Sequence, residues 1–288
     1  YARSFFRDDV HTPWGAAIDF RKPQVREFFI QNALMWLMEY RFDGLRLDAV
    51  HAITERDWLG ELAARVRLSA EPGRHVHLVL ENEHNAASLL RDGDTHGDFD
   101  AQWNDDGHNV LHVLLTGERE AYYAAYAEAP AQRLARVLQD GFCYQGEPSP
   151  IHENAPRGEP SAHLPPTAFV LFLQNHDQIG NRAFGERLTQ LAHPDALYAA
   201  QVLLLLSPQI PMLFMGEEWG STCPFQYFTS HHGMLAEAVR EGRRREFAKF
   251  EAFADPHQRE RIPDPNDELT FLASSPGEAN LADPAQLN

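Results

Sequence analysis

Short apolar runs that end in Asp, Glu, His or Asn recur along this chain, and helical patterns separate them. We place about five such strands, around Leu45, Leu78, Ala101, Leu171 and Leu213. Strands that alternate with helices favour a parallel sheet, and acids at the strand ends favour chemistry at the carboxyl face of an α/β barrel. Because a barrel of this kind closes with eight strands, we expect the chain to hold the later part of a TIM (β/α)8 barrel.

The pattern also predicts how the chain is divided. We assign residues 1–255 to the C-terminal portion of a catalytic barrel. Residues 256–288 are polar and rich in proline, so we expect a tail or a linker toward a C-terminal domain, with no clear element. Residues 1–22 are predicted to form an irregular, aromatic-rich loop. The apolar run 202–206 is predicted to be a buried helix segment, and the run from 210 is predicted to be a buried strand.

Composition excludes several classes of function. The chain has 288 residues, of which 43% are hydrophobic, so it can bury the core of one large domain or two. A formal net charge of −17 gives no electrostatic footprint for nucleic acid or an anionic membrane. Two cysteines far apart in sequence fit a reducing compartment, and we expect a cytoplasmic protein. No apolar run reaches transmembrane length.

The stretch FDGLRLDAVHAI, residues 42–53, carries the first candidate acid. Period-two alternation puts Leu45 and Leu47 on the face toward the outer helices, and Arg46 and Asp48 on the inward face. A guanidinium beside a carboxyl group favours the ionised acid, which suits a nucleophile rather than a proton donor. A buried structural ion pair at a strand end is the alternative.

A second acid, Glu81, directly follows the apolar run Leu78–Leu80 and has no cation near it in sequence. A carboxyl group at the edge of an apolar strand is a candidate for a raised pKa, which a proton donor needs. Glu83 shares the parity of Glu81 and is its rival. We favour Glu81 because it abuts the apolar run, although the pattern alone does not decide between them.

A third acid, Asp177, lies in QNHDQIGNR directly after His176. A neutral histidine beside a carboxylate can bind sugar hydroxyls as a pair. Two carboxylates of opposed pKa together with a third acid are what glycoside hydrolysis through an oxocarbenium-like transition state requires. Taken singly, each acid is better explained as a cap for the helix that follows its strand. Taken together on consecutive strands, they favour the catalytic interpretation.

Other side chains at strand ends have less certain roles. Trp103 and its polar neighbours Asn104, Asp105 and Asp106 are candidates for leaving-group subsites, where an aromatic plate would lie beside hydroxyl acceptors. Trp103 is also readily explained as a core aromatic, and Trp14 in HTPWG has the same two explanations.

Metal-binding motifs are absent from the sequence. The fifteen histidines show neither HExxH nor a Cys/His ligand spacing, and there is no Asp-x-Asp-x-Asp-Gly loop. We therefore predict no metal and no cofactor.

Three segments, GLRLDAVHAI, HLVLENEHN and FLQNHDQIGNR, resemble the second, third and fourth signature regions of the α-amylase superfamily. The resemblance is sharper for one branch, the maltooligosyltrehalose trehalohydrolase family, and it extends from the start of the chain to about residue 271. Segments that carry it include AQWNDDGHNVLHVLLTGE, GFCYQGEPSP, PMLFMGEEWGSTCPFQYFT and VREGRRREF. It implies a barrel of the α-amylase type.

The resemblance also implies an activity. Members of the family hydrolyse, with retention, the α-1,4 bond next to the terminal trehalose of a maltooligosyltrehalose, in trehalose biosynthesis. By resemblance, Asp48 is the nucleophile, Glu81 the acid and then base, and Asp177 the transition-state stabiliser.

Four further residues lie in the matched segments. By resemblance, Arg46 orients Asp48, while His51, Asn175 and His176 contact the sugar. The implied partners are an α-glucan oligosaccharide substrate and a maltooligosyltrehalose-forming enzyme that supplies it.

One signature region is missing from the chain. The superfamily's first region, an apolar strand ending in Asp-Val-Val-Tyr-Asn-His, is not found. We therefore expect a piece of a longer enzyme that is not active by itself. Two other functions stay open: a branching-enzyme-like α-glucan transferase, and a sugar-binding protein without catalysis.

Overall fold

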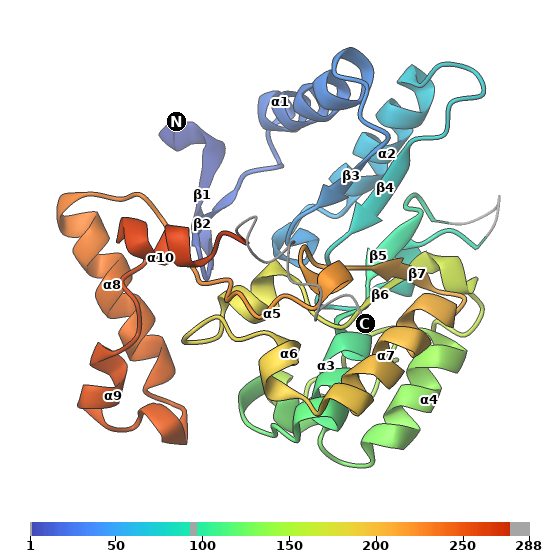
Figure 1. Ribbon diagram of the computed structural model, residues 1–288. Coiled ribbons are helices and arrows are strands. Elements are labelled where there is room, and N and C mark those ends of the chain that lie inside the picture. Colours follow the sequence, from blue (N-terminus) through green and yellow to red (C-terminus); the bar gives the residue numbers. More distant parts are fainter. Residues whose placement is uncertain (1, 93–96, 277–288) are drawn as a thin grey trace. The chain divides into compact units, whose positions relative to one another are not determined.

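The computed structural model describes residues 2–92 and 97–276. Five strands form one sheet in chain order (Figure 1). They are β3 (Gly44–Leu47), β4 (His77–Leu80), β5 (Ala101–Trp103), β6 (Phe169–Phe172) and β7 (Ile210–Met212). The pairs β3–β4, β4–β5 and β5–β6 are parallel. The predicted strands and the predicted fold class, part of a (β/α)8 barrel, are therefore confirmed.

Helices follow the strands, as a parallel sheet requires. The α-helices within the described residues are α1 (Pro23–Leu34), α2 (Asp57–Ser69), α3 (Asp105–Thr116), α4 (Pro130–Asp140), α5 (His176–Gly180), α6 (Leu188–Leu191), α7 (Pro194–Leu206), α8 (Gly233–Phe247), α9 (Pro256–Glu260) and α10 (Glu268–Ala273). Helix α1 continues as a π-helical turn over Met35–Glu39. No helix in the described part of the chain is long and apolar enough to cross a membrane.

The chain divides into two compact units, which are described separately. The first contains residues 1–106, 136–171 and 208–210, and the second contains residues 107–135, 172–207 and 211–288. The first unit thus holds β3, β4 and β5 with the helices α1 and α2, whereas the second holds α5 to α10.

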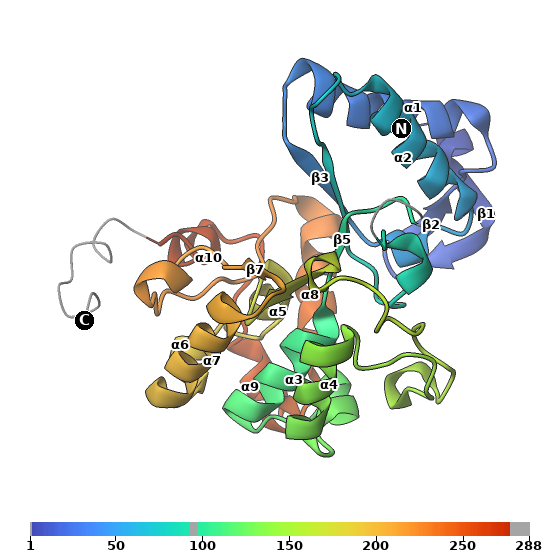
Figure 2. The same ribbon diagram turned by 90° about the vertical axis from the view of Figure 1, so that its right-hand side faces the viewer.

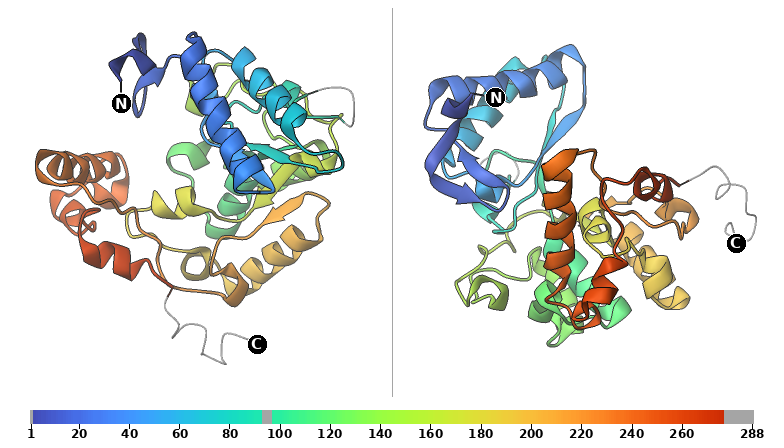
Figure 3. Two further views of the ribbon diagram at one scale, coloured as in Figure 1. Left: turned by 90° about the horizontal axis from the view of Figure 1, so that it is seen from above. Right: turned by 90° about the vertical axis from the view of Figure 1, so that its left-hand side faces the viewer.

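The core of the first unit forms between the strands and the helices α1 and α2, which pack against each other (Figure 3). The predicted outward face of β3, Leu45 and Leu47, packs against this core. Gly44 is required where β3 and β4 approach closely, because a Cβ there would overlap the carbonyl oxygen of His77.

Residues 2–22 are not an irregular loop, and that prediction is wrong. They contain an antiparallel pair, β1 (Phe6–Thr12) and β2 (Gly15–Ile18) (Figure 2). The pair escapes the sequence pattern because β1 is largely exposed, so its side chains do not alternate between apolar and polar. Trp14 lies in the turn between the two strands and is 71% exposed.

Two apolar segments are less buried than predicted. In α7, Leu205 and Leu206 are exposed, and in β7 Ile210 is 40% exposed. A continuous apolar run therefore predicts the helix or the strand correctly here, but it does not show which side chains are buried.

The region after residue 255 contains two short helices rather than no element. These are α9, with Asp255 as its N-cap, and α10, with Asp267 as its N-cap. The predicted boundary at residue 255 stays a prediction, and residues 277–288 of the predicted tail lie outside the described residues.

Candidate active site

Arg46 joins the first two candidate acids in the first unit. Its Nη1 lies 2.7 Å from Asp48 Oδ1, and its Nη2 lies 2.9 Å from Glu81 Oε2. One guanidinium therefore contacts both carboxylates. The expected pairing of Arg46 with Asp48 is present, although Asp48 lies in the turn that follows β3.

The strand register brings these acids to one edge of the sheet. Leu47, the last residue of β3, is the partner of Leu80, the last residue of β4. Asp48 directly follows β3 and Glu81 directly follows β4. Ala49 then turns the chain with φ 46°, and its N–H donates to Glu81 Oε2 at 2.8 Å. A turn amide thus orients one oxygen of Glu81 toward the end of β3.

The surroundings of Glu81 differ from those expected. The prediction of a proton donor rested on the lack of a cation near it in sequence, yet the neighbouring strand supplies the guanidinium of Arg46. Because an opposite charge favours the ionised carboxylate, this part of the reasoning was wrong. A parallel sheet places side chains together that are far apart in sequence, and a local pattern does not reveal them.

Glu83 faces a different set of groups from Glu81. Its carboxylate lies 3.8 Å from His51 Nε2 and 3.4 Å from His152 Nε2. Burial lowers the pKa of His51, whereas the charges of Glu83 and Asp48 act in the opposite direction. Glu83 thus lies between two imidazoles, whereas Glu81 and Asp48 both contact the guanidinium of Arg46.

Two tryptophans lie close to this edge. The Arg46 guanidinium carbon is 4.1 Å from the centroid of the Trp103 ring, which is within the range of a cation–π contact. The exposed ring of Trp14 lies 6.3 Å from the His51 ring. Trp103 is half-buried at the end of β5, so it is not a fully buried core aromatic.

Asp106 is a structural residue, and the prediction that it binds substrate is wrong. Its carboxylate is fully buried and pairs with buried Arg157 at 2.7 Å. It also accepts hydrogen bonds from Asn85 Nδ2 and from the backbone N–H groups of residues 143 and 144. These contacts anchor the long segment 141–166, and they leave the carboxylate no access to a ligand. The fold thus uses Asp106 to hold a loop.

Two neighbours of Asp106 differ in exposure. Asn104 is also fully buried, and its side chain donates to the carbonyl of Gly141 at 2.8 Å. Its predicted place in a leaving-group subsite is therefore wrong as well. Asp105 is half-buried in the first turn of α3, so its predicted role as a substrate contact is still open.

The third candidate acid lies in the second unit, on α5. Asp177 Oδ2 is 3.5 Å from His176 Nε2, and both side chains are almost half exposed. The predicted pair is therefore present. Asn175 is buried and its side chain accepts from the N–H groups of Asp177 and Gln178, so it caps α5. Its oxygen is used to position the helix, and its predicted contact with the sugar stays a prediction.

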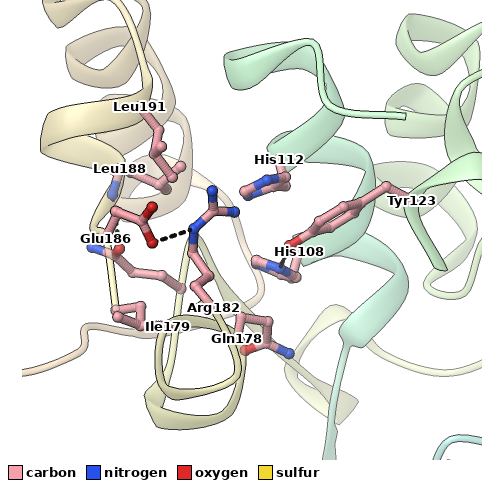
Figure 4. Close-up of a pocket in the computed structure, with 10 residues that line it drawn as sticks. His108, His112, Tyr123, Gln178, Ile179, Arg182, Glu186, Leu188 and Leu191 are labelled. Carbon is pink, nitrogen blue, oxygen red and sulfur yellow. Dashed lines mark hydrogen bonds and ion pairs between the residues drawn. The ribbon is translucent and has the colours of Figure 1, made fainter. Parts of the chain in front are cut away.

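A small pocket in the second unit lies beside α5 (Figure 4). It is lined by His108, His112, Tyr123, Gln174, Gln178, Ile179, Arg182, Glu186, Leu188 and Leu191. Arg182 follows α5 and binds Glu118 through both Nη atoms, at 2.9 and 2.8 Å. His112 Nε2 lies 2.8 Å from the same carboxylate. This network fixes the segment that follows the helix carrying Asp177.

Burial and hydrogen bonds together set the protonation of this network. Burial would raise the pKa of Glu118, but hydrogen bonds from His112 and Arg182 outweigh it and lower the pKa to about 2. His108 is fully enclosed, and burial lowers its pKa to about 3. Its Nδ1 lies 2.7 Å from the carbonyl of Leu173, which identifies Nδ1 as the protonated nitrogen of the neutral ring.

Sequence reasoning missed Glu217, which follows β7. Burial raises its pKa to about 7, and its carboxylate accepts from the N–H of Phe214 at 2.6 Å. The adjacent Glu218 is exposed and accepts from the N–H of Gly216. The Glu-Glu pair in the sequence gives no signal for which of the two is buried.

Comparisons with known proteins were made by sequence and by structure. No family model matches the chain. Malto-oligosyltrehalose trehalohydrolase from Deinococcus radiodurans is 42% identical over 279 residues, which are 95% of this chain and 44% of that protein. The protein of the same name from Arthrobacter ramosus is 43% identical over 271 residues, 91% of this chain and 46% of its own length. The chain thus spans less than half the length of these curated relatives.

A crystal structure from Salmonella typhimurium, described as a candidate alpha amylase, superposes with a TM-score of 0.91. It is 45% identical and covers 99% of this chain, which in turn covers 48% of it. The predicted resemblance is therefore confirmed in sequence and in fold. This chain belongs to the malto-oligosyltrehalose trehalohydrolase family.

Proposed function

We propose that this chain carries catalytic residues of a retaining glycoside hydrolase. The enzyme would cleave the α-1,4 bond next to the terminal trehalose of a malto-oligosyltrehalose and release trehalose. The observation that carries the proposal is the contact of one guanidinium, that of Arg46, with two carboxylates at the ends of adjacent strands. The substrate is taken from the names of the relatives, which are trehalohydrolases.

The first step would form a covalent intermediate. Asp48 would attack the anomeric carbon as the glycosidic bond breaks, and Glu81 would donate its proton to the leaving oxygen. In the second step Glu81 would take a proton from water, which replaces Asp48 at the same carbon. Arg46 suits this cycle because its guanidinium contacts both carboxylates and can hold them in one geometry.

The remaining candidates would bind the sugar. Asp177 would stabilise the transition state by holding neighbouring hydroxyls, and His176 would assist as a hydrogen-bond partner. His51 and Asp105 would contact hydroxyl groups near the cleaved bond. Trp103 and the exposed ring of Trp14 offer apolar faces on which a glucose unit can stack.

We also propose a cellular setting. A maltooligosyltrehalose-forming enzyme would supply the substrate, because the trehalose unit must be made at the chain end before it is released. Both enzymes would be cytoplasmic, which fits the two free cysteines of this chain.

Product analysis tests the proposal. The protein that contains this chain is incubated with maltotriosyltrehalose, and we expect trehalose and maltotriose. Glucose without trehalose would overturn the assignment. New α-1,6 links on amylose, seen by iodine staining, would indicate a branching transferase instead. Substrate binding without any product would indicate a sugar-binding protein.

Azide separates the roles of the two acids. In Asp48→Ala, azide can replace the missing nucleophile and should give a β-glycosyl azide from an activated substrate. In Glu81→Ala, azide should attack the covalent intermediate and give the α-glycosyl azide. Glu83→Ala is the matched control and should show no rescue. Rescue of Glu83→Ala in place of Glu81→Ala would exchange their roles.

A further inference from the structure

Two histidines and an aspartate come together at the amino ends of the strands in the first unit. His75, His77 and Asp100 each offer a ligand atom, and these atoms all lie within 4.8 Å of one another. His77 is the first residue of β4, and Asp100 directly precedes β5. The absence of a metal-binding motif in the sequence therefore does not exclude a metal-binding cluster in the fold.

The arrangement of the two histidines follows from strand geometry. His75 lies two residues before His77, where the chain enters β4, a spacing that puts side chains of an extended backbone on the same side. Their ring centroids are 4.5 Å apart. Both side chains are exposed, so the imidazoles can rotate without disturbing the core.

Asp100 is held through its Oδ2 atom, which orients its Oδ1 atom toward His75. Its Oδ2 accepts from the N–H of Leu78 at 2.7 Å and from Arg67 Nη2 at 2.7 Å. Its Oδ1 lies 3.2 Å from His75 Nε2. Outer contacts of this kind commonly orient a carboxylate that binds a metal. Arg91 Nη1, at 3.9 Å from Oδ1, opposes a cation by its charge.

We propose that His75, His77 and Asp100 bind a divalent first-row transition metal of the zinc type, with water as the fourth ligand. Imidazole nitrogens suit Zn²⁺, Ni²⁺ and Cu²⁺, whereas Mg²⁺ and Ca²⁺ prefer all-oxygen sites. Tetrahedral zinc with bonds of about 2.0–2.2 Å needs ligand atoms roughly 3.3–3.5 Å apart. The 3.2 Å between His75 Nε2 and Asp100 Oδ1 is close to this spacing, and rotation of His77 would bring its ligand atom, which lies within 4.8 Å of the other two, into range.

This site is separate from the carboxylates of the proposed reaction. His77 is the first residue of β4 and Glu81 directly follows its last residue, so the two lie four residues, or about 13 Å, apart along the strand direction. Metal binding can therefore be tested without reference to activity.

Zinc titration tests the proposal. The protein, purified without a histidine tag and stripped with a chelator, is titrated with ZnCl2 in a calorimeter at pH 7.5. We expect one Zn²⁺ per molecule. The double variant His75→Ala with His77→Ala should lose at least roughly tenfold in affinity. The matched control replaces the exposed pair His231 and His232 by alanine and should leave this binding unchanged.

A charge variant makes the test sharper. Arg91→Gln removes the positive charge near Asp100 Oδ1 and should tighten zinc binding. Co²⁺ in place of Zn²⁺ should give the visible absorption bands of a four- or five-coordinate ion, and the double variant should lose them. Equal zinc binding by the wild type and the double variant would overturn the proposal. So would loss of binding in the control alone, with circular dichroism showing that every variant is folded.

Discussion

The guanidinium of Arg46 reaches from one strand to the next and lies 2.9 Å from the carboxylate of Glu81. The same group binds Asp48 and stacks on the ring of Trp103. A planar guanidinium can serve three neighbours at once because its donors form a rigid fork above a flat, polarisable face. Arg46 therefore sets the relative position of the two acids on which the proposed reaction depends.

Replacement of Arg46 by lysine should lower kcat more than it changes KM. Lysine keeps the positive charge but loses the fork, so the two carboxylates are no longer held in one geometry. Misplacement of a catalytic group by about 1 Å can cost roughly 10²-fold in rate. Steady-state kinetics on maltotriosyltrehalose measures this change.

Arg41→Lys is the matched control for this variant. Arg41 pairs with Glu71, and both side chains are more than half exposed, so the substitution should leave kcat unchanged. A kcat for Arg46→Lys equal to that of the wild type would remove Arg46 from the proposed mechanism.

Asp106→Asn should destabilise the fold. The substitution leaves Arg157 buried without its charged partner, which typically costs about 3–5 kcal/mol. Asp105→Asn, one residue earlier and half-buried in the first turn of α3, should cost less than about 1 kcal/mol. Urea unfolding of both variants measures the difference. A raised KM with unchanged stability in Asp106→Asn would restore the substrate-binding role.

The local sequence pattern was sufficient to predict which strand ends carry the candidate acids. Period two in residues 44–48 places Arg46 and Asp48 together, and the apolar run before Glu81 identifies the neighbouring strand. Since parallel strands end at one edge, the two acids meet wherever the strands are adjacent. The position of the two acids therefore follows largely from two short stretches, whereas the contact of Arg46 with Glu81 does not.

Contacts between distant segments were not predictable in this way. Asp106 is adjacent to a strand end like the other acids, but Arg157 and the backbone at residues 143 and 144 enclose it. Those partners come from a loop with no periodic pattern, so nothing in the sequence around Asp106 distinguishes a buried anchor from a sugar ligand. The cluster of His75, His77 and Asp100 was missed because its members come from two separate segments, at the starts of β4 and β5.

Glu83→Gln should lower the pKa of His51 further. Burial already lowers this pKa, and the negative charge of Glu83 counteracts part of the effect. Glutamine keeps the size of the side chain but removes this charge, so the effect of burial on the pKa of His51 is less well compensated. An NMR titration of the His51 ring measures the shift. Glu153→Gln, at an exposed position of the long segment, should leave the His51 titration unchanged. A rise in the pKa of His51 would contradict the assigned contact.

Mild acid should destabilise the second unit through His108. The unfolded imidazole binds a proton below its ordinary pKa of about 6.5, whereas the folded one, with a pKa of about 3, does not. Between these values the unfolded state holds more protons, so stability falls as the pH falls. One such group changes the free energy of unfolding by about 1.4 kcal/mol per pH unit. Between pH 5 and 6 the carboxylate of Glu118 contributes little, because its folded pKa of about 2 and its ordinary pKa of 4.5 both lie below this range.

His108→Asn isolates this contribution. The asparagine Nδ2 can donate to the carbonyl of Leu173 in place of the His108 Nδ1, but it does not titrate. Urea unfolding between pH 5 and 6 should therefore show a slope smaller by about one proton than in the wild type. His112, whose pKa burial also lowers, should retain its own share of the slope. His163→Asn, at an exposed position, should keep the wild-type slope. An unchanged slope in His108→Asn would mean that the buried ring already takes up its proton in the folded protein.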